Sequence, residues 1–482
     1  MQPTERSASS AVGELAGAPS VLMSLGARDM LFVLCVFVML GMSMLAPFNA
    51  LIAVLEYFRD AYRGTGRGES VIGPLLTTSF NLFAFLAAVY ALRAGTGQRR
   101  NPAHTLLTMM RWATALVCVF VLLVAVRGTA PTAFPVAFAV FTTLLTVTLA
   151  AVVGRVQSST MVLCTRLSLD GRLAGYVIVG QAIQGVLSSL VNFVSLAAVT
   201  KAPGAPTSTT HENKTAALVM FISTALLLLA SHVALDRVLR IPALAEWMHE
   251  FHDAADSPEK CEEPWLRRVR RVGRDVWAWC LSMALLFTLT LAVYPELTSH
   301  VRTVSIPWLQ DESLFVALHI VLFNAADFAG RQLPLVSSHL IVRTSWVAMA
   351  LCVVRFALVP ALLWCNLAPP YTPPSHPLPD VVFMLLVWTL GMTTGSLTVS
   401  IFVSGPQAVG RTHASPGYPR APLTDAEGEM LMPRAADAAA HAHAARDDAR
   451  HDAAFASALL SCSLLGGLVC GGVIGMVFAG MA

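Results

Sequence analysis

The segment Phe323-Asn-Ala-Ala-Asp-Phe-Ala-Gly-Arg331 lies inside an apolar stretch that is long enough to cross a bilayer as a helix. An ionised side chain at bilayer depth costs about 2.5–3.5 kcal/mol on insertion scales, and here Asp327 and Arg331 are one turn apart. At about 100° per residue, Asn324, Asp327 and Arg331 fall within roughly 60° of one another. The segment therefore predicts a polar helix face directed into a bundle, either as a structural ion pair between helices or as a site for a polar solute.

The composition of the whole chain is that of a membrane protein with many spans. Hydrophobic residues make up 56% of the 482 residues and charged residues 13%, and the mean hydropathy is +0.65. We expect an all-α bundle of about eleven transmembrane helices, because apolar runs of about 20 residues recur along the chain. These runs lie near 30–57, 71–92, 105–126, 134–157, 173–199, 215–235, 276–295, 313–333, 341–367, 381–403 and 454–478.

The distribution of Lys and Arg predicts the orientation of these spans. An odd number of spans puts the termini on opposite sides, and connections rich in Lys and Arg belong in the cytoplasm. With the N-terminus cytoplasmic, most of these residues fall on the inner side. The expected organisation is a cytoplasmic tail at 1–29, six spans within 30–239, a cytoplasmic loop at 240–274, and five spans within 275–482 with a disordered cytoplasmic loop at 408–452. The disordered loop is Ala-rich and contains His441 and His443, a composition that cannot bury a core.

Charge and cysteine usage exclude several classes of partner. The net charge is only +3, and acidic residues nearly balance the basic run at 267–271, so no nucleic-acid partner is expected. Most of the nine cysteines lie in apolar runs without the spacing of a disulfide or zinc framework. No span carries facing His and carboxylate ligands for a divalent metal path, so we expect no metal site and no cofactor.

Two further spans carry residues suited to a flat polar ligand. In the first span, Pro47 is followed by Phe48 and Asn49. A proline inside a span bends the helix, which either is a packing kink or makes room for a ligand, and Phe48 offers a ring face for stacking. In the fourth span, the amide of Gln157 can donate and accept at once, which matches the edge of a purine or pyrimidine.

Polar residues in other spans have more than one interpretation. Gln181 and Gln184 lie one turn apart in the fifth span, where both can face the interior and one can join two helices. Arg155 lies near the expected end of the fourth span and can extend to the cytoplasmic interface. Arg355 in the ninth span is either part of a cytoplasmic gate pair or a packing partner.

These segments, taken in order, resemble the equilibrative nucleoside transporter family. The family motif Phe-Asn-x-x-Asp-x-x-Gly-Arg of the eighth helix matches 323–331 at every defined position. The first-helix signature Leu-Pro-Trp-Asn is similar to Ala46-Pro-Phe-Asn49, although Ala46 replaces Leu and Phe48 replaces Trp. The opening of the fifth helix, Ser-Gly-Gln-Gly, is similar to the stretch around Gly180 and Gln181.

The resemblance implies a fold like that of the major facilitator superfamily, with six helices against five and one central site that opens alternately to each side. It implies transport of nucleosides, and possibly nucleobases, by a facilitated or proton-coupled route. The implied base contacts are stacking on Leu45 and Phe48 and reading by Gln157, while Asp327 accepts from a ribose hydroxyl and Arg331 donates to the sugar. The full predicted substrate-binding set is Leu45, Phe48, Asn49, Gln157, Gln181, Asn324, Asp327 and Arg331.

Two other classes of function remain as alternatives. A proton or metal-ion carrier would use Asp327 alone and would tolerate the loss of Gln157. An intramembrane enzyme needs two facing carboxylates or a Gly-x-Ser-x-Gly elbow, whereas only Asp327 lies deep in a span. We therefore expect a non-enzymatic, monomeric, multi-pass carrier in the lipid bilayer of the plasma membrane, with a nucleoside as its small-molecule partner.

Overall fold

The computed structural model describes residues 25–61, 67–94, 101–127, 134–168, 171–200, 210–246, 264–306, 312–367, 378–413 and 435–480. Among these residues, eleven helical segments are long and apolar enough to cross a membrane. The prediction of an all-α bundle with about eleven spans is therefore confirmed. The one β-bridge that the described residues form joins Val301 to Leu367.

Helices make up nearly all of the described chain. The six spans of the first half are α2 (Ala27–Ala53), α4 (Arg67–Arg93), α5 (Pro102–Val126), α6 (Pro135–Leu167), α7 (Arg172–Thr200) and α8 (Thr210–Leu239). In the second half, α13 (Ser345–Val354), η4 (Arg355–Ala357) and α14 (Leu358–Leu363) together form one span, and the other four are α10 (Trp265–Val293), α12 (Glu312–Val336), α15 (Asp380–His413) and α16 (Ala435–Gly480). Short helices connect them at α3 (Leu55–Ala61), α11 (Glu296–Ser299) and η3 (Ser338–Leu340).

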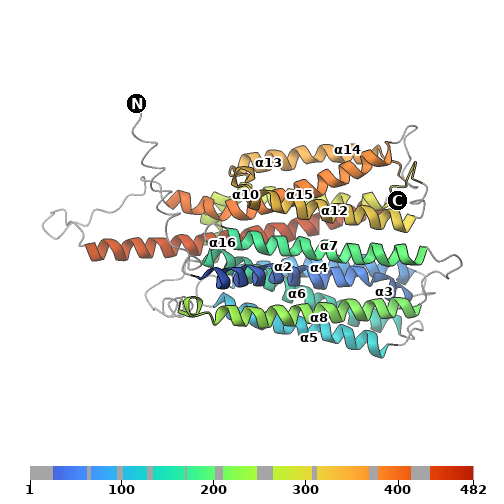
Figure 1. The fold of residues 1–482 in the computed structure, drawn as a ribbon, viewed down its shortest axis with the longest axis horizontal. Helices are drawn as coiled ribbons and strands as arrows, with labels where there is room; N and C mark the ends of the chain where they lie inside the picture. The colour runs from blue at the N-terminus through green and yellow to red at the C-terminus, as the bar shows by residue number, and fades with distance from the viewer. Residues whose placement is uncertain are drawn as a thin grey trace.

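The helices form two halves that meet along α7 and α16 (Figure 1). In the first half, α4 packs on α6, α2 on α7 and α8, and α5 on α6 and α8. In the second half, α12 packs on α15, and α10 packs on α16, α15 and α13. Contacts between the halves are made by α7 with α12 and α15, and by α16 with α4 and α6. The polar segment on α12 therefore faces a helix of the opposite half.

Glycine allows the backbones of α2 and α7 to touch. A Cβ atom added to Gly41 would overlap the carbonyl of Val177, and one added to Gly180 would overlap the carbonyl of Val38. Small residues at helix interfaces permit this close approach inside a membrane, where dispersion contacts rather than water drive packing. Gly180, the residue before Gln181, thus allows the short distance between α7 and α2.

The fourth span is longer than expected from its apolar run. Helix α6 continues to Leu167 instead of ending near 157. The polar residues after Gln157 are buried, and Thr160 and Thr165 each donate to a carbonyl one turn earlier, at 2.7 and 3.0 Å. Arg155 consequently lies about 18 Å before the helix end, with its guanidinium 5.7 Å from the Tyr90 ring centroid, and not at the end of the span.

Two helices begin inside segments that were expected to be loops. Helix α10 begins at Trp265 and α16 begins at Ala435, and α16 projects past the neighbouring helices in Figure 1. The two are joined by Asp452, which accepts from Arg268 at 3.2 Å and from Arg271 at 3.0 Å. Residues 247–263 and 414–434 of the expected loops lie outside the described residues.

Candidate functional site

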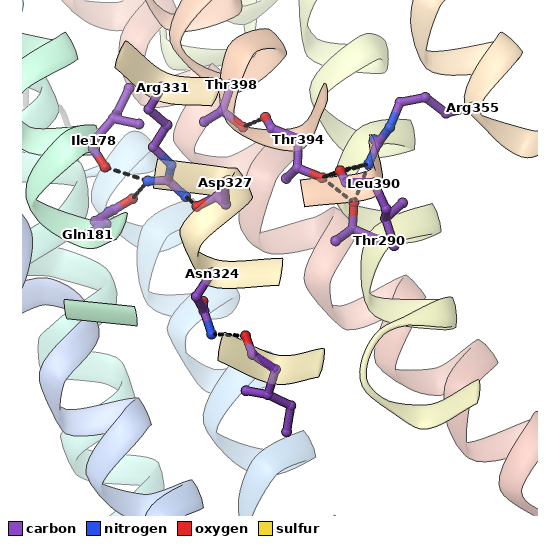
Figure 2. Close-up of polar contacts among 11 residues, drawn as sticks. Ile178, Gln181, Thr290, Asn324, Asp327, Arg331, Arg355, Leu390, Thr394 and Thr398 are labelled. Carbon is purple, nitrogen blue, oxygen red and sulfur yellow. Dashed lines mark hydrogen bonds and ion pairs between the residues drawn. The ribbon is translucent and has the colours of Figure 1, made fainter. Parts of the chain in front are cut away.

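The motif on α12 forms a buried ion pair. Arg331 Nη2 lies 2.7 Å from Asp327 Oδ2, and the two side chains are only 8% and 7% exposed (Figure 2). Their spacing of four residues places them on neighbouring turns of one helix face. At this depth each charge compensates the other, and the loss of either one would leave an uncompensated buried charge.

Arg331 also joins the two halves of the bundle. Its Nη1 donates to the backbone carbonyl of Ile178 and to the Oε1 atom of Gln181 at 3.5 Å, both on α7. Figure 2 shows this guanidinium between α12 and α7. Any change in the packing of the halves must therefore change the partners of Arg331.

Helix α15 supports the pair from the other side through a close backbone approach. A Cβ atom added to Gly395 would overlap the carbonyl of Asp327 and would lie 3.0 Å from Cγ of Arg331. In the reciprocal contact, a Cβ atom on Gly330 would overlap the carbonyl of Met392. The two glycines therefore fix the distance between α12 and α15 at the level of the pair.

The pair leaves one acceptor and one donor available. Asp327 Oδ1 and Arg331 Nε are both buried, and neither makes a hydrogen bond to another described residue. An unpartnered buried polar atom costs about 1–3 kcal/mol, so such atoms favour the approach of a ligand that can bond to them. An acceptor beside a donor suits a hydroxyl group, which can do both.

Asn324 faces the same neighbouring helix as Arg331. Its Nδ2 donates to the carbonyl of Ile320 at 3.0 Å, and a Cβ atom added to Gly185 of α7 would lie 2.7 Å from its Oδ1. The expectation that the three polar residues of the motif share one helix face is therefore met by the geometry.

Asn49, predicted on the first span, contacts α7 two turns after Gln181. Asn49 donates to Ser188 at 3.5 Å, and Gln184 donates to the same hydroxyl at 3.2 Å. Gln184 thus takes part in the joining of α2 to α7, while Gln181 binds Arg331. Leu45 is partly exposed, and the ring of Phe48 lies 5.1 Å from that of Phe80 at 42°.

Gln157 belongs to neither group. Its side chain on α6 is buried, and its Nε2 atom makes no hydrogen bond to another described residue. The structure therefore brings Asp327, Arg331 and Gln181 into direct contact and places Asn324 beside them. Leu45, Phe48, Asn49 and Gln157 make no bond to this cluster among the described residues.

A second buried guanidinium belongs to Arg355, for which the sequence left two interpretations. Its donors reach Thr290 Oγ1 at 3.1 Å, Thr394 Oγ1 at 2.6 Å and the carbonyl of Leu390 at 3.2 Å (Figure 2). A fourth bond, at 3.4 Å, goes to the carbonyl of Leu286. These partners lie on α10 and α15, so Arg355 packs helices within the second half, and the ion pairs of the described residues do not include it.

The sequence did not identify one aromatic contact beside the motif. The ring of Tyr294, after α10, stacks on Phe323 with centroids 3.8 Å apart and planes 18° apart. Phe323 is the first motif residue, so this stack holds the α12 motif against the end of α10. The sequence shows Tyr294 but cannot predict that it stacks on Phe323, because stacking across helices has no local sequence signal.

Comparison with known proteins agrees with the motif. The family described as "Nucleoside transporter" matches residues 254–416. The chain is 23% identical over 239 residues to Equilibrative nucleotide transporter 8 of Arabidopsis thaliana, a match of 50% of this chain and 54% of the relative. It is 25% identical over 144 residues to Equilibrative nucleoside transporter 1 of Rattus norvegicus, covering 29% and 31%. In these segments the chain is similar to equilibrative nucleoside transporters. The matches span about half of the plant relative and a third of the rat one.

Solved structures share the fold of this chain. The proton:xylose symporter XylE, of the major facilitator superfamily, aligns with a TM-score of 0.55 at 11% identity, covering 95% of this chain and 90% of that one. The fucose:proton symporter FucP, in the outward conformation, aligns with a TM-score of 0.54 at 11% identity, covering 93% and 92%. The expected major-facilitator-like arrangement is confirmed.

Proposed function

We propose that this protein moves nucleosides, and also nucleobases, across a membrane by alternating access between its two halves. The observation that carries the proposal is the buried Asp327–Arg331 pair, which lies where α12 of one half meets α7 of the other. A central polar site that touches both halves is what alternating access requires, because ligand binding and rearrangement of the halves must be coupled.

The sugar end of the substrate is assigned to the pair. Asp327 Oδ1 accepts from a ribose hydroxyl, Arg331 Nε donates to the sugar, and the bond between their other atoms keeps both charges balanced. When the halves separate at this level, Arg331 loses its acceptors on α7, and a bound hydroxyl can replace one of them. Gln181 of α7 bonds to Arg331, and Asn324 lies one turn before Asp327 on α12.

The base end is assigned to the first half of the chain. Leu45 and Phe48 supply an apolar wall, and Gln157 supplies the buried, unpartnered Nε2 atom that can read a base edge. Asn49 lies on the same helix as the wall and is held by Ser188. A nucleoside with an apolar face at one end and hydroxyls at the other matches this division.

The proposal includes the membrane context. The N-terminus is cytoplasmic, the protein acts as a monomer at the plasma membrane, and it performs no enzymatic reaction. The ion-carrier alternative is not favoured by the similarity to nucleoside transporters.

Uptake into liposomes that contain the purified protein tests the proposal. A radiolabelled panel of nucleosides and nucleobases is supplied at two pH values, with and without a protonophore. We expect saturable nucleoside uptake that unlabelled nucleoside competes away, and sensitivity to the protonophore if protons are coupled. Proton or metal-ion flux without uptake of any member of the panel would contradict the proposed class.

A further inference from the structure

The outer face of the α5–α8 helix pair carries charge in a place where lipid is expected. These two helices pack together on the first half, and only 28% of the residues in each apolar window are buried inside the protein. Most side chains there are apolar, as a lipid-facing surface requires. Arg111, on α5, is an exposed exception, and its neighbour Trp112 is 59% exposed.

Arg111 lies within the apolar span of α5 and not at its end. It follows the start of α5 at Pro102 by nine residues, or about 13 Å along a helix of 25 residues, whereas the hydrocarbon core is about 30 Å thick. Helical side chains point towards the N-terminus of their helix, so Arg111 extends towards the surface at which α5 begins. A guanidinium at this depth is costly unless an anion neutralises it.

The residue that Arg111 contacts cannot provide that neutralisation. Arg111 Nε donates to His232 Nε2 of α8 at 3.3 Å. Since arginine stays protonated, Nε2 is the acceptor, so the imidazole is neutral with its proton on Nδ1. The Nδ1 atom is buried and has no hydrogen-bond partner among the described residues. At the surface, the exposed guanidinium of Arg111 therefore presents donors that have no matching acceptor.

The nearest carboxylate on α8 is already paired. Asp236, one turn beyond His232, binds Arg240 at 2.6 Å. Arg111 takes part in none of the ion pairs formed by the described residues, and the exposed Arg237 adds positive charge at the same end of α8. The exposed surface is thus cationic and carries the donors of Arg111.

We propose that Arg111 and His232 form a binding site for the phosphate headgroup of an anionic phospholipid, in the leaflet at which α5 begins. The headgroup phosphate accepts from the exposed guanidinium of Arg111, which His232 orients by accepting from Nε, and the acyl chains follow the apolar α5–α8 surface beside Trp112. Basic surfaces between transmembrane helices at the level of the headgroups suit anionic lipids. The site is separate from the Asp327–Arg331 pair and does not depend on which solute is transported.

Lipid binding to the purified protein tests this site. Phosphatidylglycerol or phosphatidylcholine is titrated into the detergent-solubilised protein, and binding is followed by native mass spectrometry and by the shift in melting temperature. The test variant is Arg111→Gln. The matched control is Arg343→Gln, which removes one exposed arginine between η3 and α13, in the other half of the bundle.

The proposal requires that Arg111→Gln binds phosphatidylglycerol about fivefold more weakly than the wild type does, since one arginine near a membrane surface contributes about that much. Phosphatidylcholine binding should not change, and Arg343→Gln should behave as the wild type. The site is refuted if Arg111→Gln and the wild type bind phosphatidylglycerol equally. It is also refuted if inorganic phosphate at the same concentration stabilises the wild type as strongly, because a soluble anion would then be the ligand.

Discussion

Arg331 and Arg355 are two arginines buried to nearly the same extent, at 7% and 4% exposure, but their surroundings differ. Arg331 has a carboxylate partner on its own helix and reaches across to the opposite half through Ile178 and Gln181. Arg355 makes no direct ion pair with a carboxylate among the described residues, and its hydrogen bonds go to hydroxyls and carbonyls of the second half. The Nε atom of each has no partner among the described residues.

The hydrogen bonds of Arg331 therefore depend on the relative position of the two halves, whereas those of Arg355 do not. When the halves rearrange, the acceptors of Arg355 move together with it, whereas those of Arg331 on α7 move away. Burial and charge alone do not make this distinction. The identity of the partner helices does.

The largest effect should come from removing either member of the pair. Asp327→Ala and Arg331→Ala each leave one buried charge without its partner and remove a proposed sugar contact, so nucleoside uptake should fall at least about 100-fold. Uptake into liposomes, normalised to the amount of folded protein, measures this. The exchange variant, with Asp327→Arg and Arg331→Asp, should also stay inactive. Full activity of the exchange variant would show that the pair only stabilises the helix packing and does not bind substrate.

A smaller loss is expected at the base end. Gln157→Ala removes a buried amide that has an unpartnered Nε2 atom, so a bound base should lose about 1–3 kcal/mol, or about 5- to 150-fold in apparent affinity. The size of the loss should vary among nucleosides, because an amide reads the base edge. Inhibition constants for a panel of nucleosides measure it. Equal affinities for wild type and variant would assign Gln157 to helix packing.

The support of the pair by α15 can be tested without altering a charge. Gly395→Ala would force a methyl group into the carbonyl of Asp327 and against Arg331, so the free energy of unfolding should fall by about 1–3 kcal/mol and uptake should weaken. Gly273→Ala is the matched control, since its Cβ would meet no atom within 4 Å. Thermal unfolding of both variants gives the comparison. Equal stability of the two would contradict the close approach of α12 and α15.

The smallest effect on substrate affinity should come from Arg355. In Arg355→Met, Thr290 and Thr394 keep their bonds to their own helix carbonyls, each at 2.7 Å, so no hydroxyl is left unpartnered. The melting temperature should fall, but the inhibition constant for a nucleoside should change less than about fivefold, because a hydrophobic residue of similar volume refills the site. If Arg355→Met lost as much affinity as Arg331→Ala, Arg355 would also contribute to substrate binding, which would contradict its assignment to helix packing.

The sequence predicted the parts of this molecule that have a local signal. Apolar runs of membrane length predicted the eleven spans, and the spacing of Asn324, Asp327 and Arg331 predicted that they share a face. The motif at 323–331 identified the family that the comparisons support. Hydrophobic length and helical period act within one segment, so one segment is enough to reveal them.

The parts that were missed depend on contacts between segments. The sequence did not predict that Arg331 binds the carbonyl of Ile178, since a backbone acceptor has no residue signature. The end of α6 was misplaced by about ten residues because buried Ser and Thr, which donate to their own helix, resemble the polar edge of a span. The choice between two interpretations of Arg355 also required the positions of α10 and α15.

The proposed contact of Asp327 with ribose is tested most directly by pairing a variant with a modified substrate. Inhibition constants are measured for a ribonucleoside and its 2′,3′-dideoxy analogue, on the wild type and on Asp327→Asn. Wild type should prefer the ribonucleoside by more than about tenfold, because the analogue leaves buried polar atoms unpaired, and Asp327→Asn should show less than about threefold preference. If Asp327→Asn keeps the full wild-type preference, the ribose hydroxyls do not bind Asp327 and the assignment of the site is wrong.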